Sequence, residues 1–285
     1  QLLHDECIEV EVVGRSGFLP MEGELSTQVV LTSLAALYPD LEKSLPKSVP
    51  LDIDIPIRTR TQCVGCPYRG LLHALKLIAR KTHGIATGDI GCYDAGSFLP
   101  LELQSTIYCM GSSIPMANGI AYSGSKQPLF SIIGDSTLFH NGVLGLINAI
   151  HNAVDMVVVV CDNRTTAMTG FQPHPGSDTS ISGKPVVAID IARLASSIGA
   201  TSVQVVNPYH IPEVTEALDK AAAEKGVSVI VASSPCYLLG RRTGNIGFSP
   251  RKVSLDADLC NGCKVCIDYF GCPAIRFSNE KASID

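Results

Sequence analysis

The stretch "SIIGDSTLFH", residues 131–140, decides how this chain folds. Its apolar part completes the run "PLFSIIG", which stops at Gly134, and the acid Asp135 follows directly. A continuous apolar run bounded by glycine is typical of a strand that is buried on both faces of a parallel sheet. We therefore predict a buried strand that ends at Gly134 and leaves the carboxylate of Asp135 just beyond the sheet.

The rest of the chain repeats this pattern of strand and helix. Helical patterns occupy residues 70–84, 142–152, 189–199 and 211–226, and apolar strand patterns occupy residues 128–134, 156–161, 201–206 and 227–233. Val- and Ile-rich strands that alternate with helices indicate a parallel sheet covered on both faces, with right-handed crossovers. The predicted fold class is α/β, a doubly wound parallel sheet.

Composition and charge exclude several classes of protein. The chain has 285 residues, 46% of them hydrophobic and 17% charged, with a formal net charge of −5. This charge argues against a nucleic-acid surface, and no apolar run reaches the roughly 18 residues of a membrane helix. No signal peptide is visible, so the eleven cysteines are expected to be thiols and metal ligands in a reducing, cytoplasmic compartment.

Changes in composition suggest five parts. We expect residues 1–45 to be the tail of a preceding α/β domain, and residues 46–60 to be a proline-containing linker. The α/β domain is predicted at 61–238, a second linker at 239–256 and a small cysteine unit at 257–285. The chain begins without Met and ends soon after this unit, so it is expected to be a fragment or a processed chain.

Asp135 and Asn163 each follow an apolar strand, and the 28 positions between them match one strand–helix–strand crossover. Both side chains should therefore emerge at the carboxyl edge of adjacent parallel strands, where open α/β sheets bind ligands. A carboxylate and an amide oxygen suit Mg²⁺, and the small residues Ser136 and Thr137 beside a helix N-terminus near Gly142 would favour a diphosphate. The alternative is that both are turn formers at strand ends.

With "TTAMTG" after Asn163, this arrangement resembles the motif of the thiamine diphosphate enzymes, which begins Gly-Asp and ends in Asn. The resemblance implies that Asp135, Asn163 and the backbone carbonyl of Thr165 bind Mg²⁺, which in turn holds the cofactor diphosphate. Ser136 stands where the motif often has Gly. The cofactor-binding residues that the resemblance implies are Ile90, Gly91, Tyr93, Gly111, Gly134, Asp135, Ser136, Thr137, Asn163, Thr165, Ala167 and Met168.

Four cysteines are candidates for a second site. Cys63 and Cys66 form "CVGC" before a helix, a spacing that suits either zinc or an iron–sulfur cluster. Cys92 lies in the turn "GDIGCYDAG", and Cys236 follows the last predicted strand. Cys236 therefore leaves the sheet at the same edge as Asp135, and a cluster that used it would lie beside the diphosphate site.

These four cysteines resemble the ligand set of the 2-oxoacid:ferredoxin oxidoreductases, in which a [4Fe-4S] cluster lies next to thiamine diphosphate. Within that family, "CVGCPYRG", "GDIGCYDAG" and "YCMGSSIPMANGIA" look most like the α subunits of the branch that oxidises indolepyruvate. Tyr68 stands where relatives commonly have His, and we assign it no role.

The terminal cysteines Cys260, Cys263, Cys266 and Cys272, with Pro273, resemble half of a bacterial ferredoxin. The usual gap before the last cysteine is three residues, and here it is five. Either one [4Fe-4S] cluster forms from these four cysteines, or an extension completes two. A zinc knuckle is the alternative.

The remaining cysteines and histidines receive no catalytic role. Cys161 is expected to be a core thiol and Cys7 an incidental one, while Cys109 could face the cofactor or simply pack. His140 is left without a role, His151 is predicted to end a helix, and His174 lies in a loop that would cover the site. No catalytic residue is identified.

The resemblance implies oxidative decarboxylation of an arylpyruvate such as indolepyruvate to an acyl-CoA and CO₂, with electrons passing to ferredoxin. It also implies oxygen-sensitive, anaerobic chemistry, and it implies a second subunit and a pyrimidine-binding domain outside this chain. Two alternatives stay open. One is a non-oxidative 2-oxoacid decarboxylase, which would leave Cys92 and Cys236 without a purpose, and the other is a non-catalytic iron–sulfur electron-transfer protein.

Overall fold

The strand predicted from residues 128–134 is the centre of the molecule. In a computed structural model, which describes residues 14, 17–45, 60–244 and 253–284, β3 spans Leu129–Gly134 and all its residues are buried. The side chains of Phe130, Ile132 and Ile133 are fully buried. Burial of each such side chain contributes about 1.5–3 kcal/mol to folding, which is why this run fixes the centre of the sheet.

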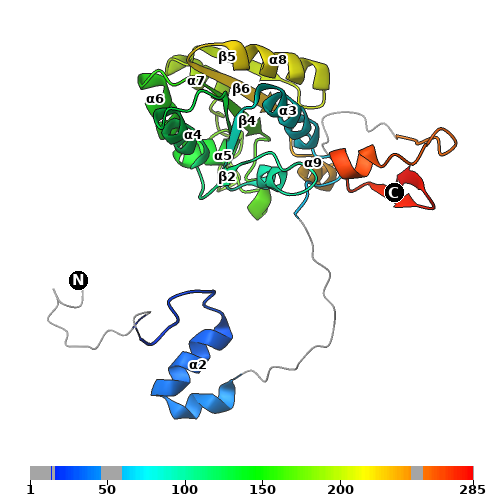
Figure 1. The fold of residues 1–285 in the computed structure, drawn as a ribbon. Coiled ribbons are helices and arrows are strands. Elements are labelled where there is room, and N and C mark those ends of the chain that lie inside the picture. Colours follow the sequence, from blue (N-terminus) through cyan, green and yellow to red (C-terminus); the bar gives the residue numbers. More distant parts are fainter. Residues whose placement is uncertain (1–13, 15–16, 46–59, 245–252, 285) are drawn as a thin grey trace. The chain divides into compact units, whose positions relative to one another are not determined.

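β3 belongs to a six-stranded sheet in which every pairing is parallel (Figure 1). The strand order is β2-β1-β3-β4-β6-β5, with bounds Ile85–Gly88 for β1, Thr106–Ile107 for β2, Met156–Asp162 for β4, Ser202–Val206 for β5 and Val227–Ser233 for β6. Gly134 is in register with Cys161, and Asp162 with Ser233. The carboxyl ends of β1, β3, β4 and β6 therefore lie in a row.

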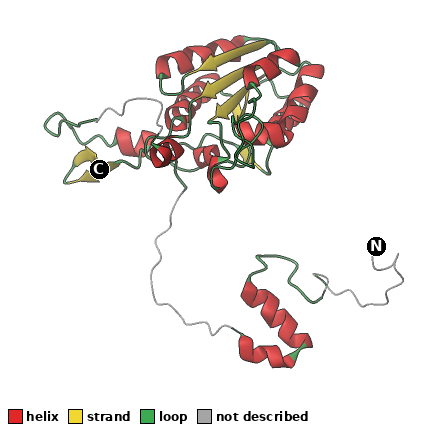
Figure 2. Cartoon of the chain, turned by 180° about the vertical axis from the view of Figure 1, so that it is seen from behind, coloured by secondary structure: helices red, strands yellow, loops and turns green. Residues whose placement is uncertain are grey.

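Helices cover both faces of the sheet (Figure 2). Along β4, Val157, Val159 and Cys161 pack toward α3 (Tyr68–Thr82) and α8 (Ile211–Ala223). The alternating residues Val158 and Val160 pack toward α4 (Ser113–Tyr122), α6 (Val143–His151) and α7 (Ile191–Ser197). This period of two confirms the doubly wound α/β fold.

The helix after β3 begins earlier than the sequence predicted. We expected its N-terminus near Gly142, but α5 (Asp135–Thr137) begins directly after Gly134 and continues through η3 (Leu138–Gly142) into α6. Asp135 thus occupies the first turn of this helix, where a negative charge is stabilised by the helix dipole.

Several short elements near the site were not predicted as elements. These are β1, β2, α4, and the short turns η2 (Cys92–Ser97) and η4 (Ala167–Thr169). β1 and β2 span only four and two residues, and glycine and serine interrupt the region around α4. Such segments lack the long apolar periodicity on which sequence reasoning depends.

The C-terminal part begins with α9 (Tyr237–Thr243), directly after Cys236. Beyond residue 252 the segment, orange to red in Figure 1, contains η5 (Cys266–Phe270) and an antiparallel hairpin of β7 (Ile275–Ser278) and β8 (Lys281–Ile284). Among the described residues, no helix is long and apolar enough to cross a membrane.

The chain divides into two compact units, Gln1–Ile57 and Arg58–Asp285. The described part of the first unit contains α2 (Thr27–Leu37), capped by Ser26, and η1 (Pro39–Ser44). Cys7 and most of the expected linker at 46–60 lie outside the described residues. The sheet and the C-terminal segment belong to the second unit.

Candidate active site

Asp135 joins the ends of β3 and β4. Its side chain is buried, and Oδ2 accepts hydrogen bonds from the backbone N–H groups of Asn163 at 2.9 Å and Arg164 at 2.6 Å. Oδ1 accepts one from the N–H of Ser136 at 2.7 Å. The carboxylate predicted at the strand end is therefore held rigidly, and Oδ1 keeps lone-pair capacity for a further partner.

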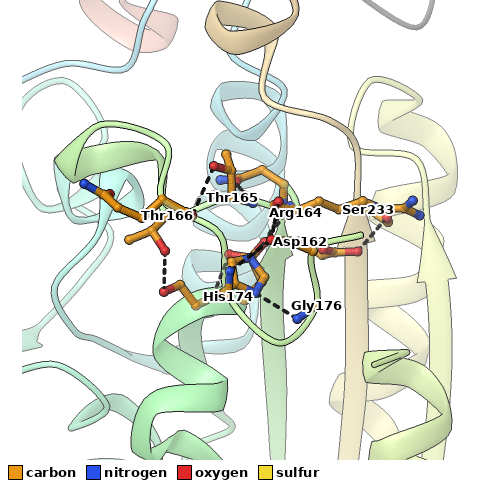
Figure 3. A network of polar contacts seen from close by, with 12 residues as sticks. Asp162, Arg164, Thr165, Thr166, His174, Gly176 and Ser233 are labelled. Atoms are coloured by element: carbon orange, nitrogen blue, oxygen red, sulfur yellow. Dashed lines mark hydrogen bonds and ion pairs between the residues drawn. The ribbon is translucent and has the colours of Figure 1, made fainter. Parts of the chain in front are cut away.

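The residues that flank Asn163 form a polar network on the β4 side, and Figure 3 labels Asp162, Arg164, Thr165 and Thr166 among them. The amide oxygen of Asn163 accepts a hydrogen bond from the N–H of Thr165 at 3.1 Å. Asp162 accepts a bond of 2.7 Å from the hydroxyl of Ser233 on β6, and burial raises the pKa of Asp162. The hydroxyl of Thr166 donates to that of Ser136 at 2.8 Å.

His174 lies inside this network. Its Nε2 is 3.1 Å from Oδ2 of Asp135, and only 4% of its side chain is exposed. Nδ1 accepts a hydrogen bond from the N–H of Gly176 at 3.0 Å, a contact drawn in Figure 3. Nε2 is buried and has no hydrogen-bond partner of suitable geometry among the described residues, so its contact with Asp135 is one of close approach.

The structure thus places His174 in the site, where the sequence had predicted only a covering loop. That loop folds back because Ser177 donates to the carbonyl of Arg164 at 3.0 Å and the ring of Phe139 lies 5.7 Å from the imidazole. The sequence around His174, "PHPG", did not indicate its contact with Asp135, because the two residues lie far apart in the sequence.

Asp135, Asn163 and their neighbours fit a magnesium ion. The donors are a carboxylate and an amide oxygen that each accept only one hydrogen bond at Oδ1, together with backbone carbonyls of the adjoining loop. Such hard oxygen donors are those that Mg²⁺ prefers. Within the described ranges, no group of three or more His, Cys, Asp or Glu side chains is gathered to hold a metal ion, so a magnesium site here would depend on the backbone and on phosphate oxygens.

A narrow cavity of about 90 Å³ runs along this site. Every residue predicted to bind the cofactor lines it except Gly111, and Tyr68, Cys92, Met110, Cys161, Thr166 and Thr169 line it as well. Ligand pockets usually measure about 300–1,000 Å³. The cavity is therefore large enough for only part of a cofactor.

Tyr93 lines one wall of this cavity, and the buried Asp89 holds its hydroxyl. The Tyr93 hydroxyl donates to Asp89, whose Oδ2 also accepts from the N–H of Gly111 at 3.1 Å and the hydroxyl of Ser113 at 3.0 Å. Burial raises the pKa of Asp89 to about 6. A Cβ on Gly134 would lie 2.8 Å from the Tyr93 ring, so glycine before Asp135 lets this ring approach.

Gly111 therefore supports the site through Asp89 without lining the cavity. Sequence reasoning assigned no role to Asp89, although its position directly after β1 matches that of Asp135 after β3. The pair Gly88-Asp89 repeats the pair Gly134-Asp135, and this repetition was the signal that could have found it.

A second cavity of about 470 Å³ lies next to the first. Cys63, Cys66, Cys92 and Cys236 all line it, so the four cysteines predicted to act together share one space. Burial raises the pKa of Cys66 to about 12, and the thiols of the other three cysteines make smaller contributions to this increase.

The two cavities share one wall. Tyr68, Cys92, Asn163, Ala167 and Met168 line both. The Tyr68 side chain is 3% exposed, its hydroxyl donates to the carbonyl of Ser234 at 3.4 Å, and burial raises its pKa well above the usual value. Tyr68, to which the sequence gave no role, is thus a neutral group between the two spaces.

Of the remaining predicted residues, Cys161 lines the first cavity and the others lie elsewhere. Cys161 is buried in β4, Cys109 is exposed, and His151 ends α6 with an exposed side chain. Cys260, Cys263, Cys266 and Cys272 lie in the C-terminal segment, where the thiol of Cys260 accepts a bond of 3.4 Å from the N–H of Ala282. Backbone donors lower the pKa of this thiol.

Comparison with protein families gives a match to the model for the "Thiamine pyrophosphate enzyme, C-terminal TPP binding domain" over residues 89–232. Comparison with curated proteins gives 37% identity to indolepyruvate oxidoreductase subunit IorA of Archaeoglobus fulgidus, covering 96% of this chain and 45% of that protein. IorA of Pyrococcus abyssi is 36% identical, with 97% and 45% covered. The chain spans about half the length of the curated relatives it matches.

Two further similarities are more distant. The 2-oxoglutarate synthase subunit KorB of A. fulgidus is 26% identical over 61% of this chain and 68% of that protein. Among solved structures, a 2-oxoglutarate:ferredoxin oxidoreductase from Magnetococcus marinus, with 2-oxoglutarate, coenzyme A and succinyl-CoA bound, has a TM-score of 0.55 and 21% identity. It covers 65% of this chain and 67% of that one, and the likeness extends to the fold.

Proposed function

Because the chain belongs to the thiamine pyrophosphate enzyme family through its C-terminal cofactor-binding domain, we propose that it is the cofactor-binding part of an arylpyruvate:ferredoxin oxidoreductase. The proposed reaction converts a 2-oxoacid, coenzyme A and two oxidised ferredoxins to an acyl-CoA, CO₂, a proton and two reduced ferredoxins. Indolepyruvate is the proposed substrate, because the relatives at 36–37% identity are named indolepyruvate oxidoreductase subunits.

The observation that carries the proposal is the shared wall between the two cavities. A thiamine-dependent decarboxylase needs only the first cavity, whereas an enzyme that removes electrons needs an acceptor nearby. Four thiols in a cavity of about 470 Å³ offer a site for a [4Fe-4S] cluster held by four cysteines. Cys92 and Asn163 line both cavities, so the acceptor would be in contact with the cofactor's surroundings.

Thiamine diphosphate, when bound, supplies the carbanion chemistry by which a 2-oxoacid loses CO₂. The protein positions the cofactor. Asp135 and Asn163 would hold Mg²⁺ with the carbonyl of Thr165, and the N-terminus of α5 lies beside the expected diphosphate. His174, 3.1 Å from Asp135, would fix the orientation of the carboxylate, and Tyr68 would exclude water between the two spaces.

The size of the first cavity and the similarity to known proteins support the proposed partners. The narrow first cavity supports a site completed by another domain or subunit that binds the pyrimidine ring. Coenzyme A is bound in the solved relative, and we propose it as the acyl acceptor here. Ferredoxin is the proposed electron acceptor, and the terminal cysteines are the proposed ligands of a further iron–sulfur site. The free thiols of the described residues suit a reducing cytoplasm.

The test is the visible absorbance of the anaerobically purified full-length assembly. Indolepyruvate with coenzyme A should bleach the iron–sulfur band within seconds, while pyruvate and 2-oxoglutarate should leave it unchanged. Aldehyde formation without bleaching would instead establish a non-oxidative decarboxylase. Iron without bound thiamine diphosphate would establish an electron-transfer protein.

A further inference from the structure

The C-terminal segment packs along α3, the helix that begins two residues after Cys66. The imidazole of His73 lies edge-on to the ring of Phe270, with 5.5 Å between centroids. The ammonium group of Lys76 lies 5.1 Å from the centre of the Tyr269 ring. Residues from one face of α3 thus hold the turn η5, which carries Cys266 and leads to Cys272.

Arg69 lies at the centre of this contact. Its side chain is 3% exposed, and Nη1 donates to the carbonyl of Phe270 at 3.0 Å. Nη2 donates to the carbonyl of Gln62 at 3.2 Å and to the hydroxyl of Thr61. Gln62 directly precedes Cys63, and Phe270 lies two residues before Cys272. One guanidinium therefore holds the backbone next to both groups of cysteines.

The charge of Arg69 also acts on both groups. Burial lowers the pKa of Arg69, while Cys272 and, more weakly, Cys66 and Cys63 act in the opposite direction. Nε is buried without a hydrogen-bond partner among the described residues. A buried donor of this kind normally has an acceptor, so this N–H is available to a group outside the described residues.

We propose that Arg69 is a positioning residue that fixes the terminal cysteine segment against the first group of cysteines and places one buried positive charge between them. A planar guanidinium can bind two backbone segments at once, in opposite directions, whereas the single ammonium of lysine cannot reproduce this fork. The docking of the segment depends only on contacts within the chain. The effect on iron–sulfur clusters rests on the proposed function.

The charge predicts a direction for reduction potentials. A cluster becomes more negative when it is reduced, and a nearby cation stabilises the reduced form. Net charge and hydrogen bonds to the sulfurs are among the factors that set these potentials. Loss of the Arg69 charge should therefore shift the reduction potentials of the clusters held by both groups of cysteines to more negative values.

The experiment compares Arg69→Met, Arg69→Lys and the control Arg80→Met in the anaerobically purified full-length assembly. Arg80 also lies on α3 and contacts the same segment, through a bond of 3.3 Å from Nη1 to the Tyr269 hydroxyl, but this contact is exposed. One readout is hydrogen exchange at the amide of Gly271, which bonds to the carbonyl of Cys266 at 3.0 Å. The other is a reductive titration followed by electron paramagnetic resonance.

Arg69→Met should speed hydrogen exchange at the Gly271 amide by about tenfold or more through local opening. It should also shift the reduction potentials of the clusters at both groups of cysteines to more negative values. Arg80→Met should match the wild type in both readouts. Arg69→Lys should speed exchange but keep the potentials close to those of the wild type. If Arg69→Met does not fold, the exchange in Arg69→Lys decides. Exchange at Gly271 equal to that in Arg80→Met would overturn the proposal. Protein without iron would refute the proposed function, yet the exchange readout would still test the docking.

Discussion

Asp135 has a structural role in the site and a proposed role in binding a cation. Its carboxylate bonds three backbone N–H groups that join the ends of β3 and β4, and it keeps capacity for a cation. The same side chain therefore organises the loop and gives it a negative charge. A residue that only closed a turn would not need to be buried beside His174.

Asp135→Asn should lower the affinity for magnesium thiamine diphosphate by at least about tenfold, because an amide removes the charge and replaces one acceptor with a donor. The measurement is the cofactor retained per chain after gel filtration of the assembly. Asp178→Asn is the matched control, since this exposed aspartate lies on the loop that carries His174. Full cofactor retention in Asp135→Asn would rule out the assigned magnesium site.

Asp89 couples folding to pH. Its pKa rises from 3.8 to about 6 through burial, so the folded state binds the proton more tightly than the unfolded state does. The stability from this group is fully present below pH 4 and is lost as the pH rises through about 6. The shift corresponds to about 3 kcal/mol.

Asp89→Asn should remove this dependence. Between pH 4 and 7, the free energy of unfolding of the variant relative to wild type should rise by about 2–3 kcal/mol, as measured by urea unfolding. Asp219→Asn, which changes a surface carboxylate paired with Lys81, controls for the loss of any carboxylate. Parallel curves for wild type and Asp89→Asn across this range would show that Asp89 is not the titrating group.

At the scale of elements, the β3–α6–β4 unit could be predicted because its signals are local. An apolar run, a glycine and an acid stand together in the sequence, and the spacing to Asn163 is one crossover. β1 and α4 could not be predicted as elements, since β1 is four residues long and α4 contains small polar residues. The contact of His174 with Asp135 depends on how a long loop folds, for which the sequence offers no periodic pattern.

The hairpin of β7 and β8 supports the terminal cysteines. Gly262 has a φ of +71°, and a Cβ there would lie 2.7 Å from the carbonyl oxygen of Glu280. Glycine is required at this turn because both the conformation and the backbone contact exclude a side chain. The loop "CNGC" and the turn before β8 therefore depend on each other.

Gly262→Ala should displace this loop, so that the terminal cysteines no longer bind iron. The expected loss is about four iron atoms per chain for one cluster. The iron of the first group should remain, because its cysteines lie in another part of the fold. Gly119→Ala is the control, as a Cβ on Gly119 meets nothing within 4 Å. Iron content of the assembly measures the effect, and an unchanged value would show that the loop tolerates the side chain.

At the scale of the molecule, the sheet order brings the functional residues together. The ends of β1, β3, β4 and β6 are neighbours, and they lead to Cys92, Asp135, Asn163 and Cys236. The sequence could place three of these at one edge, because each follows a predicted strand. It could not show that Tyr68 lies between the two cavities or that Arg69 links both groups of cysteines, since these contacts come from α3 packing against distant segments.

The proposed function depends above all on an electron acceptor in the cavity that four cysteines line, beside the thiamine site. The most direct measurement is the iron content and substrate-driven bleaching of the anaerobic full-length assembly that carries Cys236→Ala. We predict a loss of about four iron atoms per chain and no bleaching by indolepyruvate with coenzyme A, while thiamine diphosphate stays bound and dithionite still reduces the remaining iron. Wild-type iron content and wild-type bleaching in this variant would contradict the account.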